Sequence, residues 1–335
     1  MAHVSNNSSA ATQKSSKFLI ATPETRNATI TPQKSSNILT NLSKKNITRD
    51  MAIVFRFDID DTLVKTMHLI YNLFKDFVKN ANPNLQQQLI GSKLSEFTNK
   101  FLDEYIGKID KMVEGIAEIY ESQGISNKLG VSPRARYDAE YENVDIIEGA
   151  VETLKLLRQL RAETGLNITV PGFSNNYMDN LNNFFNSRAQ NKELRSNLDA
   201  VIAAERVDDL DSNSKPQFDK TGNKKTKPKY KSKPLTEAYM KGAEANSIPT
   251  SSEESINFDI GDRGTDGLFS KNFQDTEKGN VGGFIFIDTH SRKVIEKDNF
   301  PAGIPIDVVN NHQELQILIR QIVTKIYNLT QKVTN

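Results

Sequence analysis

The sequence contains no cysteine among its 335 residues. This absence excludes disulfide bonds, thiolate metal sites and cysteine nucleophiles, and it fits a reducing compartment. The chain also lacks any run approaching about eighteen apolar residues, so no membrane-spanning helix is expected. The formal net charge is only +1, which argues against a dedicated binder of nucleic acid or other polyanions. With 37% hydrophobic and 25% charged residues, the composition predicts a soluble globular protein, and we expect a cytoplasmic location.

Acidic residues are scarce at the start of the chain, where residues 1–50 contain only Glu24 and Asp50. This segment is rich in Ser, Thr and Asn and cannot bury enough apolar area to offset its ordering entropy, so it is expected to be a disordered tail. It lacks the apolar core of a secretory signal. An organelle transit peptide, which is also acid-poor and rich in hydroxyl groups, is one functional alternative. A secretion address is another.

The rest of the chain alternates between two hydrophobic patterns. β-Branched and aromatic stretches that end in polar residues predict strands, whereas apolar residues at three- and four-residue steps predict helices. Such alternation is typical of an α/β fold with a Rossmann-like parallel sheet and helices on both faces. The expected strands cover 52–59, 167–173, 200–204, 255–262 and 282–290, and the expected helices cover 146–165, 234–247 and 312–327.

Two segments interrupt this alternation. Between residue 67 and about residue 123 the apolar residues recur at helical spacing, which predicts an all-helical insert after the first strand. Residues 205–232 are polar and rich in lysine, with Gly, Pro, Ser and Asp between the lysines, and we expect a flexible basic surface loop. A nucleic-acid patch is the disfavoured alternative there, because Phe218 and Tyr230 are the only aromatic residues of the loop.

Polar clusters follow the expected strands at their carboxyl ends, where ligands bind in a sheet of this kind. If these strands pair as neighbours, the clusters meet in one crevice. A lysine-bearing segment, KSKP, precedes the helix that leads into the fourth strand. The clustered residues are Asp58, Asp60, Asp61 and Thr62, then Ser174, Asn175 and Asn176, and finally Asp262 and Asp266.

Several carboxylates in one crevice cannot all stay ionised unless a cation is present or one of them is protonated. Because the chain has no cysteine and its histidines are scattered, we expect an oxygen-only site for a hard ion such as Mg²⁺. A lysine and a hydroxyl beside the metal complete the set that holds a phosphoryl group. One aspartate can then attack phosphorus, and a second, protonated aspartate can donate to the leaving oxygen.

These motifs resemble, in this order, the four motifs of the haloacid dehalogenase superfamily, over residues 53 to about 325. The first family motif is Asp-x-Asp-x-Thr, and DIDDT at 58–62 has all three fixed residues. By this resemblance Asp58 is the nucleophile, and Asp60 is the general acid and base, which also offers its backbone carbonyl to Mg²⁺. Dehalogenases lack an acid at the Asp60 position, so the resemblance favours phosphoryl transfer. Asp61 stands where the family more often has glycine, and we assign it no catalytic role.

The resemblance also assigns the residues that follow the second and fourth strands. Ser174 matches the hydroxyl that binds phosphate, and Asn175 is a candidate to share this contact. Asp262 and Asp266 match the carboxylates of the fourth motif, of which the first usually touches the metal and the second supports it. The expected metal ligands are therefore Asp58, Asp60, Asp262 and Asp266.

The third family motif is a lysine that steadies charge on the nucleophile and on the phosphoryl group. Three lysines of this chain compete for that role. Lys233 is our choice, because a proline and a predicted helix follow it, but Lys229 and Lys231 stay open as alternatives.

In this superfamily, an insert between the first and second motifs is a helical cap over the active site. The resemblance thus divides the chain into a catalytic core, residues 51–66 and 145–330, and a C1-type cap at 67–144. A cap excludes water and reads the part of the substrate beyond the phosphate. The expected function is a Mg²⁺-dependent phosphatase that forms an aspartyl-phosphate and acts on a small phosphorylated metabolite or a protein phosphotyrosine.

The tail, the asparagine-rich composition and the basic loop are also similar to phosphotyrosine phosphatases of this superfamily that bacterial pathogens inject into host cells. Two further functions stay open. One is a catalytically idle scaffold that binds a partner, although the intact set of four motifs argues against it. The other is a phosphomutase, which would retain the phosphate on a sugar.

Overall fold

The computed structural model describes residues 36–67, 69, 72, 133–218, 224, 226–231, 233–288 and 300–332. Most of the insert expected at 67–144 lies outside these residues, so the predicted cap stays a prediction. One helix of that range is described, α7 (Pro133–Tyr141), and it packs on α9. Among the helices of the described ranges, none combines the length and apolar character needed to cross a membrane.

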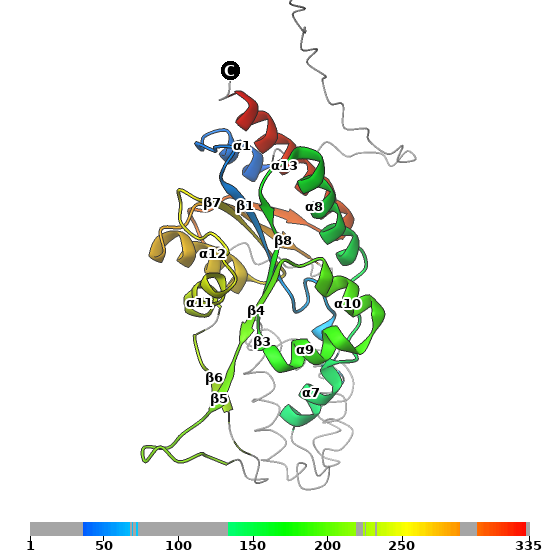
Figure 1. The fold of residues 1–335 in the computed structure, drawn as a ribbon, viewed down its shortest axis with the longest axis vertical. Coiled ribbons are helices and arrows are strands. Elements are labelled where there is room, and N and C mark those ends of the chain that lie inside the picture. Colours follow the sequence, from blue (N-terminus) through cyan, green and yellow to red (C-terminus); the bar gives the residue numbers. More distant parts are fainter. Residues whose placement is uncertain are drawn as a thin grey trace, which may run out of the picture. The chain divides into compact units, whose positions relative to one another are not determined.

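A parallel sheet of seven strands forms the centre of the fold, in the order β4-β3-β1-β7-β8-β9, with β2 paired to β1 (Figure 1). Every neighbouring pair in it is parallel, which confirms the predicted α/β fold class. The strands are β1 (Ala52–Asp58), β2 (Ile168–Thr169), β3 (Pro171–Tyr177), β4 (Ala200–Ala204), β7 (Ser255–Gly261), β8 (Val281–Ile287) and β9 (Ile306–Val309). All residues of β1, β7 and β8 are buried, as expected for parallel strands that are covered on both faces.

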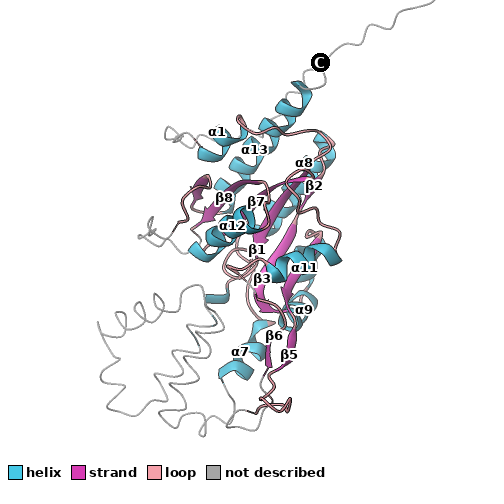
Figure 2. Ribbon diagram, turned by 90° about the vertical axis from the view of Figure 1, so that its left-hand side faces the viewer, coloured by secondary structure: helices cyan, strands magenta, loops and turns pink. Residues whose placement is uncertain are grey.

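Helices cover both faces of this sheet (Figures 1 and 2). The helices fall into two groups, one on each face of the sheet, and the buried apolar residues of each group belong to a separate cluster. The first group is α1 (Asn37–Leu42), α8 (Ala150–Thr164), α9 (Met178–Ser187), α10 (Ala189–Ser196) and α13 (His312–Lys332), and the second is α11 (Glu237–Ala245) and α12 (Gly264–Thr276).

The beginning of the described chain corrects the predicted extent of the tail. We expected residues 1–50 to be disordered, but α1 forms within this range, and Ile38 and Leu42 are fully buried in the core. Ser36 caps the helix by accepting a hydrogen bond from the backbone N–H of Leu39 at 3.1 Å. Two buried side chains four residues apart suffice to bind a short helix to β8 and α13, although the surrounding composition is polar.

The lysine-rich segment begins and ends in a short antiparallel pair, β5 (Arg206–Asp208) and β6 (Thr226–Pro228). We call residues 205–231 the basic arm. Three of its lysines pair with acidic residues in or next to β5: Lys224 with Asp208 at 2.6 Å, Lys227 with Asp209 at 3.1 Å and Lys229 with Glu205 at 2.9 Å. The base of the arm is thus a hairpin with largely compensated charge.

His312, the first residue of α13, ties that helix to the loop after β1. Its Nε2 lies 2.8 Å from the backbone oxygen of Thr62, and its Nδ1 lies 3.0 Å from the hydroxyl of Thr153 in α8. The space for the ring is made by Gly149, which has φ +82° and whose Cβ, if present, would lie 2.8 Å from the Cβ of His312. Burial lowers the pKa of His312 to about 4, so the ring is neutral near pH 7.

Replacing Ile38 by Ala should lower the free energy of unfolding by about 2–4 kcal/mol, because it leaves a cavity under α1. Thr40→Ala, on the exposed face of the same helix, is the matched control and should change it by less than about 1 kcal/mol. Urea unfolding of both variants measures the difference. Equal effects would show that α1 does not contribute to the core.

The buried neutral His312 predicts a loss of stability in mild acid. The unfolded chain takes up a proton near pH 6.5 and the folded chain only near pH 4, so the contribution of the neutral ring is complete above pH 6.5 and is lost as the pH falls toward 4. The size of this loss is about 3 kcal/mol. The advantage of the wild type over His312→Gln in urea unfolding should therefore shrink between pH 7 and pH 4. A pH-independent difference would contradict the assignment.

Candidate active site

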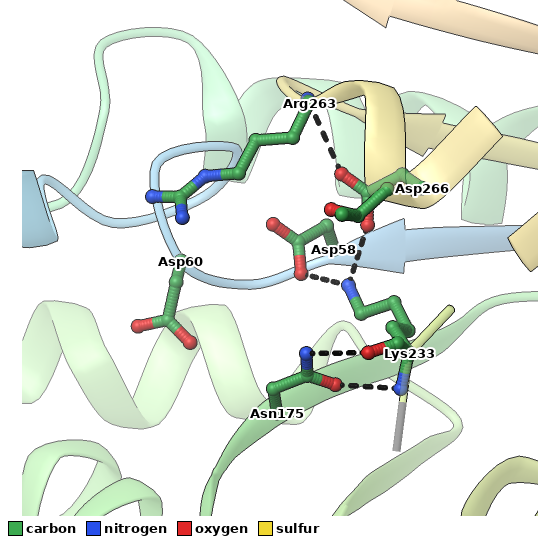
Figure 3. A pocket seen from close by; sticks show the side chains of 7 residues that line it. Asp58, Asp60, Asn175, Lys233, Arg263 and Asp266 are labelled. Atoms are coloured by element: carbon green, nitrogen blue, oxygen red, sulfur yellow. Dashed lines mark hydrogen bonds and ion pairs between the residues drawn. The ribbon is translucent and has the colours of Figure 1, made fainter. Parts of the chain in front are cut away.

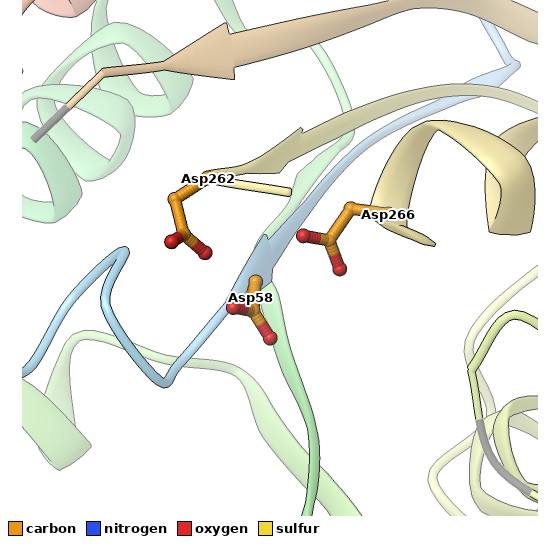
Figure 4. A group of neighbouring side chains, drawn as sticks. All are labelled: Asp58, Asp262 and Asp266. Atoms are coloured by element: carbon orange, nitrogen blue, oxygen red, sulfur yellow. The ribbon is translucent and has the colours of Figure 1, made fainter. Parts of the chain in front are cut away.

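Three carboxylates meet at the carboxyl edge of the sheet. Asp58 ends β1, Asp262 follows the end of β7, and Asp266 lies in the first turn of α12 (Figure 4). One carboxylate oxygen from each lies within 4.8 Å of the others, and all three side chains are buried. They meet because β1 and β7 are parallel neighbours, so the ends of both strands lie at the same edge of the sheet.

A buried ion pair holds these two strands in register below the carboxylates. Arg56 of β1 and Asp259 of β7 are paired residues, and the guanidinium binds the carboxylate through two hydrogen bonds of 2.5 and 2.9 Å. The guanidinium also lies over the ring of Phe273 at 4.0 Å. A slip of one residue would break this pair and move Asp58 away from Asp262, so the ion pair helps to position the site.

Lys233 is the cation that contacts Asp58 and Asp266 in the crevice (Figure 3). Its Nζ binds Oδ1 of Asp58 and lies 2.7 Å from Oδ1 of Asp266. Burial disfavours the charged ammonium, but the Asp266 and Asp58 carboxylates outweigh this effect and raise the pKa of Lys233. Of the competing lysines, Lys229 pairs with Glu205 and Lys231 is exposed. Lys233 is therefore the lysine that the fold brings to the carboxylates.

Asn175 holds the backbone of this lysine. Its Oδ1 accepts from the N–H of Lys233 at 2.9 Å, and its Nδ2 donates to the carbonyl oxygen of Lys233 at 3.2 Å (Figure 3). Both polar atoms of the amide are thus engaged with one residue. The sequence predicted a phosphate contact for Asn175, and the structure places it beside the crevice as the support of Lys233.

The pKa of Asp58 is well above its usual range. Burial is the main cause; Lys233 opposes it, and the carboxylates of Asp266, Asp262 and Asp60 raise the pKa further. So many carboxylates around one ammonium favour the binding of an additional cation.

Asp60 points away from this group (Figure 3). Its carboxylate accepts hydrogen bonds from the hydroxyl of Ser174 at 2.5 Å and from that of Tyr141 at 2.8 Å. Burial raises the pKa of Asp60, and these two hydrogen bonds partly offset the rise. Ser174, predicted to bind phosphate, therefore contacts the predicted acid. Tyr141 was missed by the sequence analysis, because it lies at the end of the insert, far from any motif.

Asp61 has a left-handed backbone conformation, which accounts for the glycine that the resemblance places at this position. Its φ is +61°, a conformation that glycine adopts freely and aspartate tolerates. The buried carboxylate accepts from the backbone N–H of Met67 at 2.7 Å and from Nη2 of Arg263 at 2.7 Å. Asp61 thus shapes the loop.

The start of α12 completes the crevice. Asp266 accepts a hydrogen bond from the backbone N–H of Arg263 at 3.3 Å, which closes the first turn. Gly261 makes room for this carboxylate, because a Cβ there would lie 2.4 Å from Oδ2 of Asp266. Arg263, which no sequence motif indicated, is buried and pairs with Asp61 at 2.7 Å and with Asp262 at 3.6 Å. The crevice is lined by Asp58, Asp60, Asn175, Lys233, Arg263, Thr265 and Asp266.

The donor set fits a hard divalent cation. Asp58, Asp262 and Asp266 offer oxygen atoms only, at a spacing that one ion can bridge, and no cysteine or histidine belongs to this group. Mg²⁺ prefers such carboxylate donors together with water and phosphate oxygens. The side chain of Asp60 lies outside the group, so its predicted contribution to the metal is left to its backbone carbonyl.

The sheet brings Asp58, Lys233, Asp262 and Asp266 together at one edge, as the resemblance to the haloacid dehalogenase superfamily predicts. No protein-family profile matches this chain, and no curated protein sequence does.

Several solved structures are similar. One is a HAD family hydrolase from Deinococcus radiodurans with bound phosphate and sodium (16% identity, TM-score 0.42, 83% of this chain and 97% of that one). Another is YfnB from Bacillus subtilis, bound to magnesium (12%, 0.45, 80% and 99%). A third is a haloacid dehalogenase-like hydrolase from Xanthomonas campestris (13%, 0.45, 84% and 98%).

Mg²⁺ should raise the thermal unfolding midpoint of the protein, because a ligand that binds only the folded state stabilises it. Asp262→Asn should abolish most of this shift by removing one charge from the site. Asp288→Asn, at the end of β8 and outside the three-carboxylate group, is the control and should keep the shift. Differential scanning fluorimetry with MgCl₂ and with EDTA measures it. An equal shift in all three proteins would contradict the site.

Proposed function

We propose that this protein is a Mg²⁺-dependent phosphatase that hydrolyses a phosphate monoester through an aspartyl-phosphate on Asp58. The observation that supports this most directly is the contact of the Lys233 ammonium with Asp58 and Asp266. Asp262 lies close enough to these two carboxylates for all three to bind one metal ion. A nucleophile, a fixed cation and a metal-binding carboxylate pair are the groups that phosphoryl transfer needs.

In the first step, an oxygen of Asp58 forms a bond to phosphorus while the bond from phosphorus to the leaving oxygen breaks. Asp60 gives its proton to that oxygen, so the alcohol or phenol leaves neutral. To reach it, the Asp60 carboxylate turns from Ser174 toward the crevice and keeps the hydrogen bond of its other oxygen to Tyr141. Lys233 holds Asp58 in position and balances the charge of the phosphoryl oxygens.

In the second step, water attacks the phosphorus of the aspartyl-phosphate. Asp60 takes a proton from this water, the bond to Asp58 breaks, and inorganic phosphate leaves. Asp58, Asp262 and Asp266, with the backbone carbonyl of Asp60, would hold Mg²⁺, which supplies positive charge for the phosphate oxygens. Ser174, which lies within β3 and contacts Asp60, is the proposed hydroxyl for the phosphate once Asp60 has turned.

A small phosphorylated metabolite and a protein phosphotyrosine both stay possible substrates, because most of the region proposed as the cap lies outside the described residues. No observation favours the scaffold, the phosphomutase or the injected-effector interpretation over the phosphatase.

Hydrolysis of p-nitrophenyl phosphate with Mg²⁺ tests the proposal. EDTA should abolish the activity, and Asp58→Asn should lower kcat by about 10³-fold or more, because the amide cannot form the covalent intermediate. Lys233→Gln should lower kcat/KM by at least about 10²-fold. The exposed Lys231→Gln, two residues away, is the matched control and should stay close to wild type. Metal-independent hydrolysis, or full activity of Asp58→Asn, would overturn the mechanism.

A further inference from the structure

The hydroxyl of Tyr141 is the one group from the end of the insert that the described structure places on Asp60. The residue is the last of α7 and is fully buried, and its Oη donates to Oδ1 of Asp60 at 2.8 Å. The other carboxylate oxygen accepts from Ser174 of β3. Asp60 is thus held between two elements, one from the sheet and one from the segment that returns from the insert.

α7 packs on α9 and contacts the basic arm. The ring of Tyr141 packs against Tyr137 and Phe184, with ring centroids 5.8 and 6.0 Å apart. On the same helix, Asp138 binds Arg206 of the basic arm at 2.6 Å. These contacts order the tyrosine before any substrate binds, so its hydroxyl can define the position of a partner at low entropic cost.

In the described residues, no hydrogen bond or ion pair joins Asp60 to Lys233 or Arg263. Without its two hydroxyl partners, the carboxylate could pair with Lys233 or Arg263, both of which line the same cavity. An acid that is paired with a cation in this way is poorly placed to give a proton to a leaving oxygen. Because the crevice contains Lys233 and Arg263, Asp60 must be kept out of an ion pair with either of them to act as the acid.

We propose that Tyr141 is a positioning residue: it holds Asp60 apart from Lys233 and Arg263 and orients it for proton transfer to the leaving group. The inference rests on the proposed phosphatase function, and it adds a residue that lies outside the four motifs. It also makes α7 the element through which the segment after the insert acts on the acid.

The test compares two substrates of similar shape. p-Nitrophenolate leaves readily without a proton, whereas phenolate needs one, so phenyl phosphate depends more strongly on the acid. For Tyr141→Phe, kcat/KM for phenyl phosphate should fall about 10- to 100-fold, and that for p-nitrophenyl phosphate by less than about 3-fold. Because both substrates are measured on one preparation, the ratio does not depend on the fraction of folded protein.

Tyr137→Phe is the matched control. It removes another buried hydroxyl from α7, one turn away, whose described contact is with Asn176 rather than Asp60. It should leave the substrate ratio unchanged. An equal loss on both substrates in Tyr141→Phe, or no loss on either, would overturn the positioning role while the phosphatase stands. Absence of Mg²⁺-dependent hydrolysis in the wild type would overturn the proposed function and this inference together.

Discussion

The ammonium of Lys233 between Asp58 and Asp266 is the interaction on which the arrangement of the crevice depends. Buried carboxylates that lie close together repel one another and lose their hydration, so a nearby cation stabilises such a group. Other features of the fold serve this contact. The Arg56–Asp259 pair holds β1 against β7, Asn175 holds the backbone of the lysine, and α12 begins where its first turn presents Asp266.

The turn of the backbone after β1 places Asp58, Asp60 and Asp61 of the first motif in different surroundings. Asp58 lies among charges, whereas Asp60 lies between two hydroxyl groups, and Asp61 in the left-handed conformation separates them from the rest of the loop. Two carboxylates two residues apart can therefore hold different proton affinities for physical reasons. This separation matches the division between nucleophile and acid that the proposed reaction requires.

Much of the fold could be predicted from the sequence, because its strands are short segments rich in β-branched and aromatic residues that end in polar residues: β4 was predicted at its observed bounds, and β1 to within one residue. The carboxyl-end polar residues were found for the same reason. α9 and α12 were missed, since asparagine, glycine and threonine hide their helical period. Tyr141 could not be found, because only the packing of α7 brings it to Asp60. That Lys233 rather than Lys229 reaches the crevice is decided by pairing with Glu205, which spacing does not reveal.

The double hydrogen bond between Asn175 and the backbone of Lys233 has a consequence for how this fold can vary. The basic arm is closed at its base by Lys229, whose backbone N–H and ammonium group both donate to Glu205. Lys233 of the crevice follows this closure in the chain. The lysine is anchored to β3, not to the arm. Insertions or deletions beyond the hairpin base therefore leave the lysine in place, and the arm is a segment in which new binding properties can evolve without cost to the chemistry.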